Sequence, residues 1–197
     1  MGTPQPLDDG ELARRAAHGN EPALAELVTR YRRYVYTIAY RIVLNEDDAL
    51  DITQEALVRL MRQVGQFDGR GPFRAWVAAI ASRQALTWVR KTASRREIVT
   101  APEEIDDLLE AEETRSDNPR QAASAAEERR LVEAALIRLP PQQRAVFTLR
   151  FQEDWTPVQI AERLTIPAQQ VRSQLHNAVT RLRELLAETP AGERSGR

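Results

Sequence analysis

The sequence predicts an all-α protein made of two small helical domains joined by an acidic flexible linker. Apolar residues recur at helical spacing in two separate blocks of the 197 residues. No run alternates apolar and polar residues as a half-buried strand would. Between the blocks lies a stretch with many acids and little periodicity. The expected divisions are an N-terminal tail with a short helix (1–19), the first domain (20–96), the linker (97–126), the second domain (127–187) and a disordered tail (188–197).

The first domain should follow a short helix over Glu11–His18. Asn20 suits the N-cap of a long helix, whose first turn tolerates Pro22 because no amide donor is needed there. Asn45 is expected to cap the next helix, and Pro72 to lie in the first turn of a third. The apolar stripe of the middle helix is Ala49, Ile52, Thr53, Ala56, Leu57, Leu60, Met61 and Val64.

The second domain should contain four helices. The first ends at Pro140, and the second spans about Gln142–Phe151. Thr156 suits the N-cap of the third helix, with Pro157 at its first position. Pro167 opens the last helix, whose apolar stripe is Val171, Leu175, Val179, Leu182 and Leu186.

The stretch Gln159–His176 has the pattern of a helix-turn-helix unit, which places one helix in the DNA major groove. The small Ala161 permits a close helix crossing, and Ile166 and Val171 can pack together in the angle between the two helices. Thr165 occupies the turn position where glycine is usual, so a left-handed backbone there costs roughly a kcal/mol. The turn is therefore expected to be mildly strained.

Polar residues crowd the start of the last helix, where a recognition helix would meet DNA. They are Gln169, Gln170, Arg172, Ser173, His176 and Asn177. Arg172 could pair with a phosphate or read guanine, while glutamine and asparagine suit adenine edges. The alternative is a plain helical hairpin with a solvated face.

Although the net charge is only −1, the basic and acidic residues are concentrated in different parts of the chain. Between positions 67 and 96 a single acid, Asp68, stands against seven cations, which are Arg70, Arg74, Arg83, Arg90, Lys91, Arg95 and Arg96. From 97 to 118 the balance reverses, with nine acids against one arginine. Local potential governs nucleic-acid binding, so the near-neutral total does not argue against it.

Aromatic residues interleave with the cations of the basic segment, as nucleic-acid stacking surfaces require. Trp76 and Trp88 recur at helical spacing and are expected inside the core instead. Phe67 and the loop Asp68–Phe73 are the better candidates for contact. A glycine-rich loop of this kind brings its backbone close to an extruded base.

The helix that follows Asn45 carries a polar face opposite its apolar stripe, with Asp51, Gln54, Glu55 and Arg62 around Val58. Carboxylates four residues apart on an open surface have no desolvated pocket, so acid–base catalysis is not expected there. A solvated face is one interpretation, and a protein-docking face is the other.

Composition excludes several further classes of function. There is no cysteine, and the only two histidines lie far apart in sequence, so a multi-histidine metal site is not expected. No apolar run approaches 18 residues, and no signal peptide is evident. We therefore expect a cytoplasmic, non-enzymatic protein without a cofactor, a metal or a membrane-inserted segment.

Four blocks of sequence together resemble extracytoplasmic-function RNA polymerase sigma factors. They are Ala39–Glu55, Phe73–Ala81, Leu139–Phe147 and the helix-turn-helix stretch Gln159–His176. The blocks occur in the order of that family, and the similarity covers roughly residues 20–96 and 127–186.

The resemblance implies a subunit that gives core RNA polymerase its promoter specificity. The first domain would dock on the clamp helices of the large catalytic subunit through Asp47, Asp51, Gln54, Glu55, Val58 and Arg62. It would hold the −10 element and trap a flipped base through Phe67, Asp68, Gly69, Arg70, Phe73, Arg74, Arg83 and Arg90. The second domain would sit on the flap of the other large subunit and read the −35 element through Arg150, Gln169, Gln170, Arg172, Ser173, His176 and Asn177. An anti-sigma factor is the usual regulatory partner in this family.

Two other functions compete with this interpretation. One is a stand-alone helix-turn-helix regulator that uses only the C-terminal helices. The other is a helical hydrolase that holds a metal through Asp47, Asp48, Asp51 and Glu55, for which the sequence offers poor support. Promoter-dependent transcription with core polymerase distinguishes the first from a sigma factor, and metal retained after dialysis would indicate the second.

Overall fold

The computed structural model describes residues 7–93 and 134–188, and within these ranges all regular secondary structure is helical. The all-α prediction is confirmed. The elements are α1 (Asp9–Ala17), α2 (Glu21–Val43), α3 (Glu46–Gln63), the 3₁₀ turn η1 (Val64–Gln66), α4 (Phe73–Ala93), α6 (Pro141–Phe151), α7 (Pro157–Leu164) and α8 (Ala168–Glu188). Residues 134–137 are also helical. The predicted linker, 97–126, lies outside the described residues.

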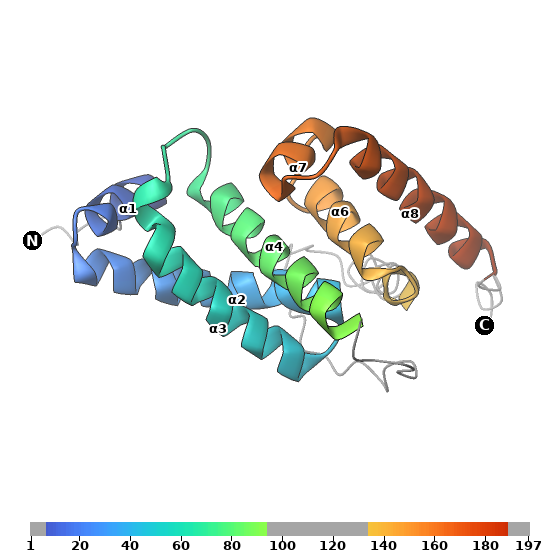
Figure 1. The fold of residues 1–197 in the computed structure, drawn as a ribbon, viewed down its shortest axis with the longest axis horizontal. Coiled ribbons are helices and arrows are strands. Elements are labelled where there is room, and N and C mark those ends of the chain that lie inside the picture. The colour runs from blue at the N-terminus through green and yellow to red at the C-terminus, as the bar shows by residue number, and fades with distance from the viewer. Residues whose placement is uncertain (1–6, 94–133, 189–197) are drawn as a thin grey trace, which may run out of the picture.

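The helices α2, α3 and α4 pack against one another, and α1 lies against α2 at one end of the bundle (Figure 1). Their meeting faces bury large aliphatic side chains almost completely, among them Leu27, Ile38, Ile52, Leu60 and Ile80. Fully burying a side chain of this size stabilises a fold by roughly 1.5–3 kcal/mol. The first domain therefore has a core of its own.

Side chains cap the helices of this domain much as their sequence positions predict. The Oδ1 of Asn20 accepts from the amide of Ala23 at 2.9 Å, and the Oδ1 of Asn45 accepts from the amide of Asp48 at 2.8 Å. The first helix begins at Asp9, two residues before its predicted start. The reason is Asp8, whose carboxylate accepts from the amide of Glu11 at 2.9 Å and caps the helix earlier.

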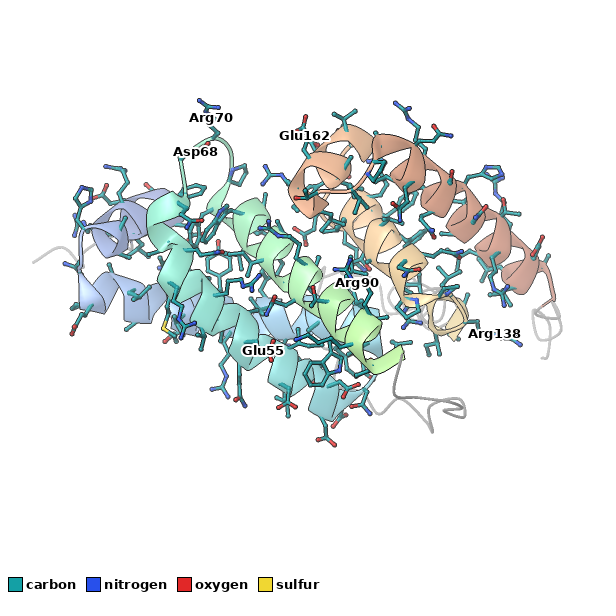
Figure 2. All side chains as sticks on the ribbon, in the orientation of Figure 1. Glu55, Asp68, Arg70, Arg90, Arg138 and Glu162 are labelled. Carbon is teal, nitrogen blue, oxygen red and sulfur yellow. The ribbon has the colours of Figure 1, made fainter. Side chains whose placement is uncertain are left out.

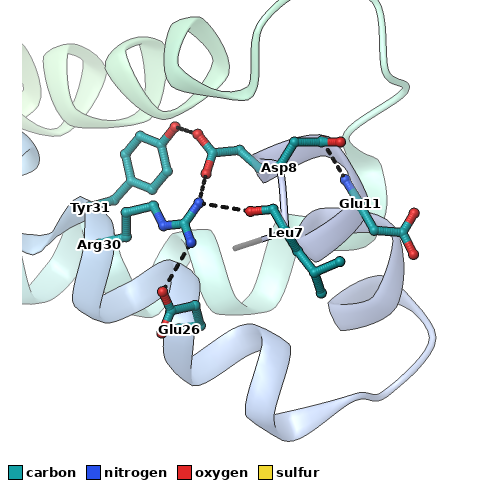
Figure 3. Close-up of polar contacts among 7 residues, drawn as sticks. Leu7, Asp8, Glu11, Glu26, Arg30 and Tyr31 are labelled. Carbon is teal, nitrogen blue, oxygen red and sulfur yellow. Dashed lines mark hydrogen bonds and ion pairs between the residues drawn. The ribbon is translucent and has the colours of Figure 1, made fainter. Parts of the chain in front are cut away.

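Polar contacts tie α1 to α2 (Figure 3). The guanidinium of Arg30 lies 2.6 Å from Asp9 and 3.0 Å from Glu26, and it also donates to the carbonyl of Leu7. The hydroxyl of Tyr31 donates to the other carboxylate oxygen of Asp9. These contacts fix the short N-terminal helix on the bundle.

The second domain is a helix-turn-helix unit supported by α6. Thr156 and Gln159 form a reciprocal capping box at the start of α7, as the sequence suggested for Thr156. Thr165 adopts the left-handed conformation expected of the turn, with φ 57°. Ile160 and Val171 are buried between the helices. A smaller group of buried side chains joins α8 to residues 135–139.

The two domains are in contact. Helix α6 lies against α2 and α4, and α7 also touches α4 (Figure 1). Buried side chains of α6, including Val146 and Leu149, continue the apolar core of the first domain. Helices from the two ends of the chain therefore form one packed body in this structure.

Four apolar side chains are more exposed than their spacing predicts. Met61 and Leu186 are 39% and 40% exposed, and Met61 lies at the edge of a stripe in which Leu60 and Val64 are buried. Trp76 and Trp88 are half-buried rather than fully inside. Helical spacing alone does not determine how deeply each tryptophan ring is buried.

Candidate polymerase and nucleic-acid interfaces

The predicted docking residues form one exposed face of α3. Asp47, Asp51, Gln54, Glu55, Val58 and Arg62 are all exposed. The opposite face of the helix, with Ile52 and Leu60, is buried in the bundle. The structure therefore brings together the whole predicted set on a surface that a partner protein can reach.

Several residues that the sequence prediction missed belong to the same surface. Leu50 is 46% exposed and lies on α3 with the exposed Val58 and Met61. An open hollow beside them is lined by Gln54, Glu55, Val58, Arg59, Arg62, Gln63 and Gln84. Exposed apolar side chains mixed with charges are typical of a protein-docking surface. Their periodicity could have indicated Leu50 and Met61, because both fall at the edge of the buried stripe.

Gln84 of α4 reaches across to the docking face. Its side chain is largely buried, and its Nε2 donates to the carboxylate of Glu55 at 3.1 Å. Figure 2 shows Glu55 on α3. The hydrogen bond positions a predicted docking carboxylate from the helix that carries predicted DNA contacts.

The predicted −10 loop projects from the bundle between η1 and α4. Asp68 and Arg70 lie at its tip, where Figure 2 labels them. The carboxylate of Asp68 accepts from the amide of Arg70 at 2.9 Å and holds the turn, while the Arg70 side chain remains 91% exposed. Gly69 has a φ of 73°, a conformation that favours glycine. The Nε of Arg70 lies 3.6 Å from the other carboxylate oxygen of Asp68, so the loop presents an exposed cation paired with an exposed acid, together with open backbone.

Phe73, predicted as a DNA contact, is instead a core residue in this structure. Its ring is 3% exposed and lies 5.4 Å from the rings of both Tyr31 and Trp76, measured between centroids. Phe67 is half-buried and packs edge-on against Phe73 at 5.1 Å. Burial arises because Phe73 begins α4 on the face toward α2. We infer that Phe73 supports the loop, and that Phe67 keeps a partly accessible ring.

The basic residues of α4 lie in different environments. Arg90 is exposed, and its guanidinium donates to Thr87 at 3.3 Å. Arg83 is half-buried, and its Nε donates to the carbonyl of Ala79 at 3.2 Å. Burial, and then the charge of Arg59, lower the pKa of Arg83. Arg83 is thus held against the helix, while Arg90 extends into solvent.

Arg74 makes contacts that the sequence did not predict. Its guanidinium lies over the ring of Tyr34, 3.9 Å from the centroid, and its Nε is 3.3 Å from a carboxylate oxygen of Glu153 in the second domain. Burial, and then the neighbouring carboxylate of Glu153, raise the pKa of Tyr34. A predicted −10 cation is therefore paired with an acid from the other half of the chain.

The predicted −35 residues of α8 share one exposed face. Gln169, Gln170, Arg172, Ser173, His176 and Asn177 are all exposed, whereas Val171 and Ala178 are buried. Arg150, near the end of α6, is half-buried, and its guanidinium lies 5.7 Å from the centroid of Phe151. The start of α8 presents the donors and acceptors of a recognition helix.

In the described ranges, no three His, Cys, Asp or Glu side chains are grouped as metal ligands would be. No helix within the same ranges is long and apolar enough to cross a bilayer.

Family models match both helical domains. The model for sigma-70 region 2 matches residues 27–95, and the model for sigma-70 region 4 matches residues 129–182. The chain belongs to the sigma-70 family of RNA polymerase sigma factors. Relatives narrow this assignment to the extracytoplasmic-function group, as the sequence resemblance indicated.

The relatives span most of the chain. The ECF RNA polymerase sigma factor SigW of Bacillus subtilis is 26% identical over 172 residues, which cover 86% of this chain and 92% of SigW. The ECF RNA polymerase sigma factor SigE of Mycolicibacterium smegmatis is 33% identical over 167 residues, 85% of this chain and 63% of SigE. Both domains are therefore similar to those of sigma factors in one continuous alignment.

Solved structures share the fold. CnrH, in complex with the cytosolic domain of CnrY, superposes with a TM-score of 0.58 and 24% identity over 92% of this chain and 99% of that chain. The sigma factor RpoE, in complex with the anti-sigma factor NepR from Bartonella quintana, gives a TM-score of 0.59 and 16% identity over 84% of this chain and 98% of that chain. These structures support the two-domain helical architecture.

Proposed function

We propose that this chain binds core RNA polymerase and directs it to promoters, and that it acts as a non-enzymatic initiation subunit in the cytoplasm. One observation carries the proposal. A single chain presents an exposed docking face on α3 and an exposed recognition face on α8, within domains that match sigma regions 2 and 4. A stand-alone regulator would need only the second of these faces.

The first domain, 20–96, binds the polymerase and the −10 element. The exposed α3 face, with its acids around Val58 and Leu50, suits the clamp helices of the large catalytic subunit. The loop with Asp68 and Arg70, followed by the cations of α4, suits single-stranded DNA because both backbone and positive charge are accessible. Polymerase docking and strand separation thus use adjacent helices.

The second domain, 127–187, binds the −35 element. Its recognition helix α8 offers Arg172 for a phosphate or a guanine, and glutamine and asparagine side chains for adenine. The same domain would sit on the polymerase flap. The acidic segment 97–126 then connects two modules that bind separate parts of one larger assembly.

An anti-sigma factor is the proposed regulator. RpoE, which shares this fold, was solved in complex with the anti-sigma factor NepR, and CnrH was solved in complex with the cytosolic domain of CnrY. The sequence contains no cysteine and therefore no thiol that could sense a signal directly. A separate protein would supply the signal.

Run-off transcription tests the function directly. Purified core polymerase should initiate from promoters selected out of a random library only when this chain is present. Selected promoters should contain two conserved blocks separated by a fixed spacer. DNA binding by this chain without any polymerase-dependent transcript would favour the stand-alone regulator.

A further inference from the structure

Gln84 is a buried polar side chain of α4 that lies at the edge of the proposed docking face. The residue is only 8% exposed, and its Nε2 donates to a carboxylate oxygen of Glu55 on α3 at 3.1 Å. Both residues line the open hollow beside α3. Burying a side-chain amide is costly unless it finds a hydrogen-bond partner. Glu55 supplies that partner, so the packing of α4 against α3 determines where the carboxylate lies.

The donor that holds Glu55 is electrically neutral. An amide N–H orients a carboxylate without cancelling its negative charge, whereas a lysine or an arginine in the same place would form an ion pair with it. Glu55 is itself exposed, and Gln84 bonds to its Oε2. The charge of Glu55 therefore remains available to a partner protein that enters the hollow.

A competing partner for Glu55 lies one turn further along α3. Arg59 is four residues on, and a glutamate followed by a cation at this spacing is the usual ion pair of an exposed helix. Arg59 lines the same hollow and lies near α4, where burial, and then the charge of Arg59, lower the pKa of Arg83. Among the residues that the structure describes, however, Glu55 forms no ion pair with Arg59 and bonds to Gln84 instead.

We propose that Gln84 is a positioning residue for polymerase docking, which holds the Glu55 carboxylate in the hollow and keeps it from pairing with Arg59. Both charges then stay available to the polymerase, Glu55 as an acceptor and Arg59 as a donor. Without the amide of Gln84, Glu55 rotates to Arg59, and the two charges cancel within the helix. The inference deepens the proposed sigma function and rests on it.

The size of the effect follows from the conformational freedom of one side chain. A glutamate that is ordered before binding avoids the entropy cost of being immobilised when the complex forms. A glutamate that is paired with Arg59 must also give up that pair before it can bind the polymerase. These costs predict that core polymerase binds about three- to tenfold more weakly when residue 84 cannot donate a hydrogen bond.

Gln84→Met tests the positioning role, because it removes the donor and keeps a side chain of similar length that suits a buried site. Ser82→Ala is the matched control. Ser82 is another buried polar residue of α4, and its hydroxyl has no hydrogen-bond partner within the described part of the chain. Affinity for fluorescent core polymerase should fall about three- to tenfold in Gln84→Met and should match the parent in Ser82→Ala. Equal affinities in Gln84→Met and the parent would overturn the proposal.

A double-mutant cycle separates positioning from a merely structural role. In the Glu55→Ala background, Gln84 has no carboxylate to hold, so Gln84→Met should cause no further loss of affinity. In the Arg59→Met background the competing cation is gone, so Gln84→Met should weaken binding less than it does in the parent. A loss from Gln84→Met that is the same in the parent as in either background would overturn the proposal.

The hydrogen bond itself can be observed in the free protein by NMR. The side-chain amide protons of Gln84, assigned through their loss in Gln84→Met, should exchange with solvent several-fold more slowly than those of Gln54, an exposed side chain on the same hollow. Glu55→Ala should speed the exchange of the Gln84 protons several-fold. Exchange at Gln84 that does not respond to Glu55→Ala would contradict the contact on which the proposal depends.

Failure of the sigma function can be told apart from failure of the positioning role. Slow exchange at Gln84 that depends on Glu55, in a chain that never binds core polymerase, would refute the sigma function, and with it the docking role, while leaving the contact intact. Promoter-dependent transcription without coupling between Gln84 and Glu55 would refute the positioning role alone. Circular dichroism must show native helix content in every variant, and Gln84→Ala replaces Gln84→Met in the cycle if the latter does not fold.

Discussion

Arg144 on α6 donates two hydrogen bonds to the carbonyl oxygen of Ile42 near the end of α2, from Nε at 3.1 Å and from Nη2 at 2.6 Å. The same guanidinium also donates to the carbonyls of Ile137 and Leu139 in its own domain. Burial lowers its pKa to about 10, so the group stays charged at neutral pH. Burying a charge among carbonyl dipoles is costly, so this contact defines how the domains fit more than it stabilises the fit.

Replacing Arg144 with lysine should lower the free energy of unfolding by about 1–2 kcal/mol. A single ammonium group cannot donate to all the backbone carbonyls that the planar guanidinium of Arg144 reaches. Urea unfolding followed by circular dichroism measures the change. Arg138→Lys is the control, since Arg138 is exposed and precedes the same helix. Equal losses in the two variants would contradict the role assigned to the Arg144 fork.

Phe73 should matter more for stability than the larger Trp76. Phe73→Ala empties a buried site between Tyr31 and Trp76 and should cost about 3–5 kcal/mol. Trp76→Ala removes a half-buried ring and should cost about 2 kcal/mol. Chemical denaturation of both variants gives the comparison. A larger loss for Trp76→Ala would place that ring inside the core, as its spacing first suggested.

Alkaline pH should destabilise the protein through Tyr34. Burial and the carboxylate of Glu153 raise the pKa of Tyr34 above its ordinary value of 10.0. The unfolded chain therefore releases this proton first, so the stability that Tyr34 provides is complete below pH 10 and is lost as the pH rises toward the folded pKa. The loss can reach about 1.4 kcal/mol per pH unit.

Tyr34→Phe removes this titration and should flatten the fall in melting temperature above pH 10. Part of the slope should remain, because burial and then Asp9 raise the pKa of Tyr31 in the same direction. At neutral pH, tyrosine titration should cause no difference in melting temperature between Tyr34→Phe and the parent protein. A slope unchanged by Tyr34→Phe would show that other groups control the alkaline transition.

Local features of the fold could be predicted because their causes lie within a few residues. Asn20, Asn45 and Thr156 cap the helices that follow them, since a cap needs only a side-chain oxygen and an amide three positions on. Thr165 adopts its left-handed backbone where a helix-turn-helix must bend. The exposed faces of α3 and α8 followed from helical periodicity in the same way.

Contacts between distant segments could not be predicted from one sequence. Arg144 and Ile42 are 102 positions apart, and a carbonyl acceptor leaves no signature in the residue type. The pairing of Arg74 with Glu153 likewise depends on how α6 docks against α4. Phe73 was expected to face DNA because it adjoins a glycine-rich loop, but the direction in which α4 starts turns its ring inward.

Asp51→Arg should weaken binding to core polymerase at least tenfold while the fold stays intact. Asp51 is exposed on the proposed docking face of α3, so reversing its charge costs little stability but changes the charge that this face presents to the polymerase. Affinity for fluorescent core enzyme measures the effect. Glu184→Arg makes the same charge change on an exposed part of α8 and should bind like the parent. Equal affinities in the two variants would show that Asp51 does not belong to the docking surface.

Arg172 should contribute to DNA binding through the start of α8. If it pairs with a phosphate, Arg172→Ala should reduce the slope of log affinity against log salt by about one and weaken all sequences alike. If it reads guanine instead, the loss should be about 1–3 kcal/mol at one promoter position and the salt slope should change little. Competition assays on selected promoters with polymerase present separate these outcomes. Arg183→Ala, at an exposed position further along the same helix, should change neither quantity, because it lies beyond the predicted contacts.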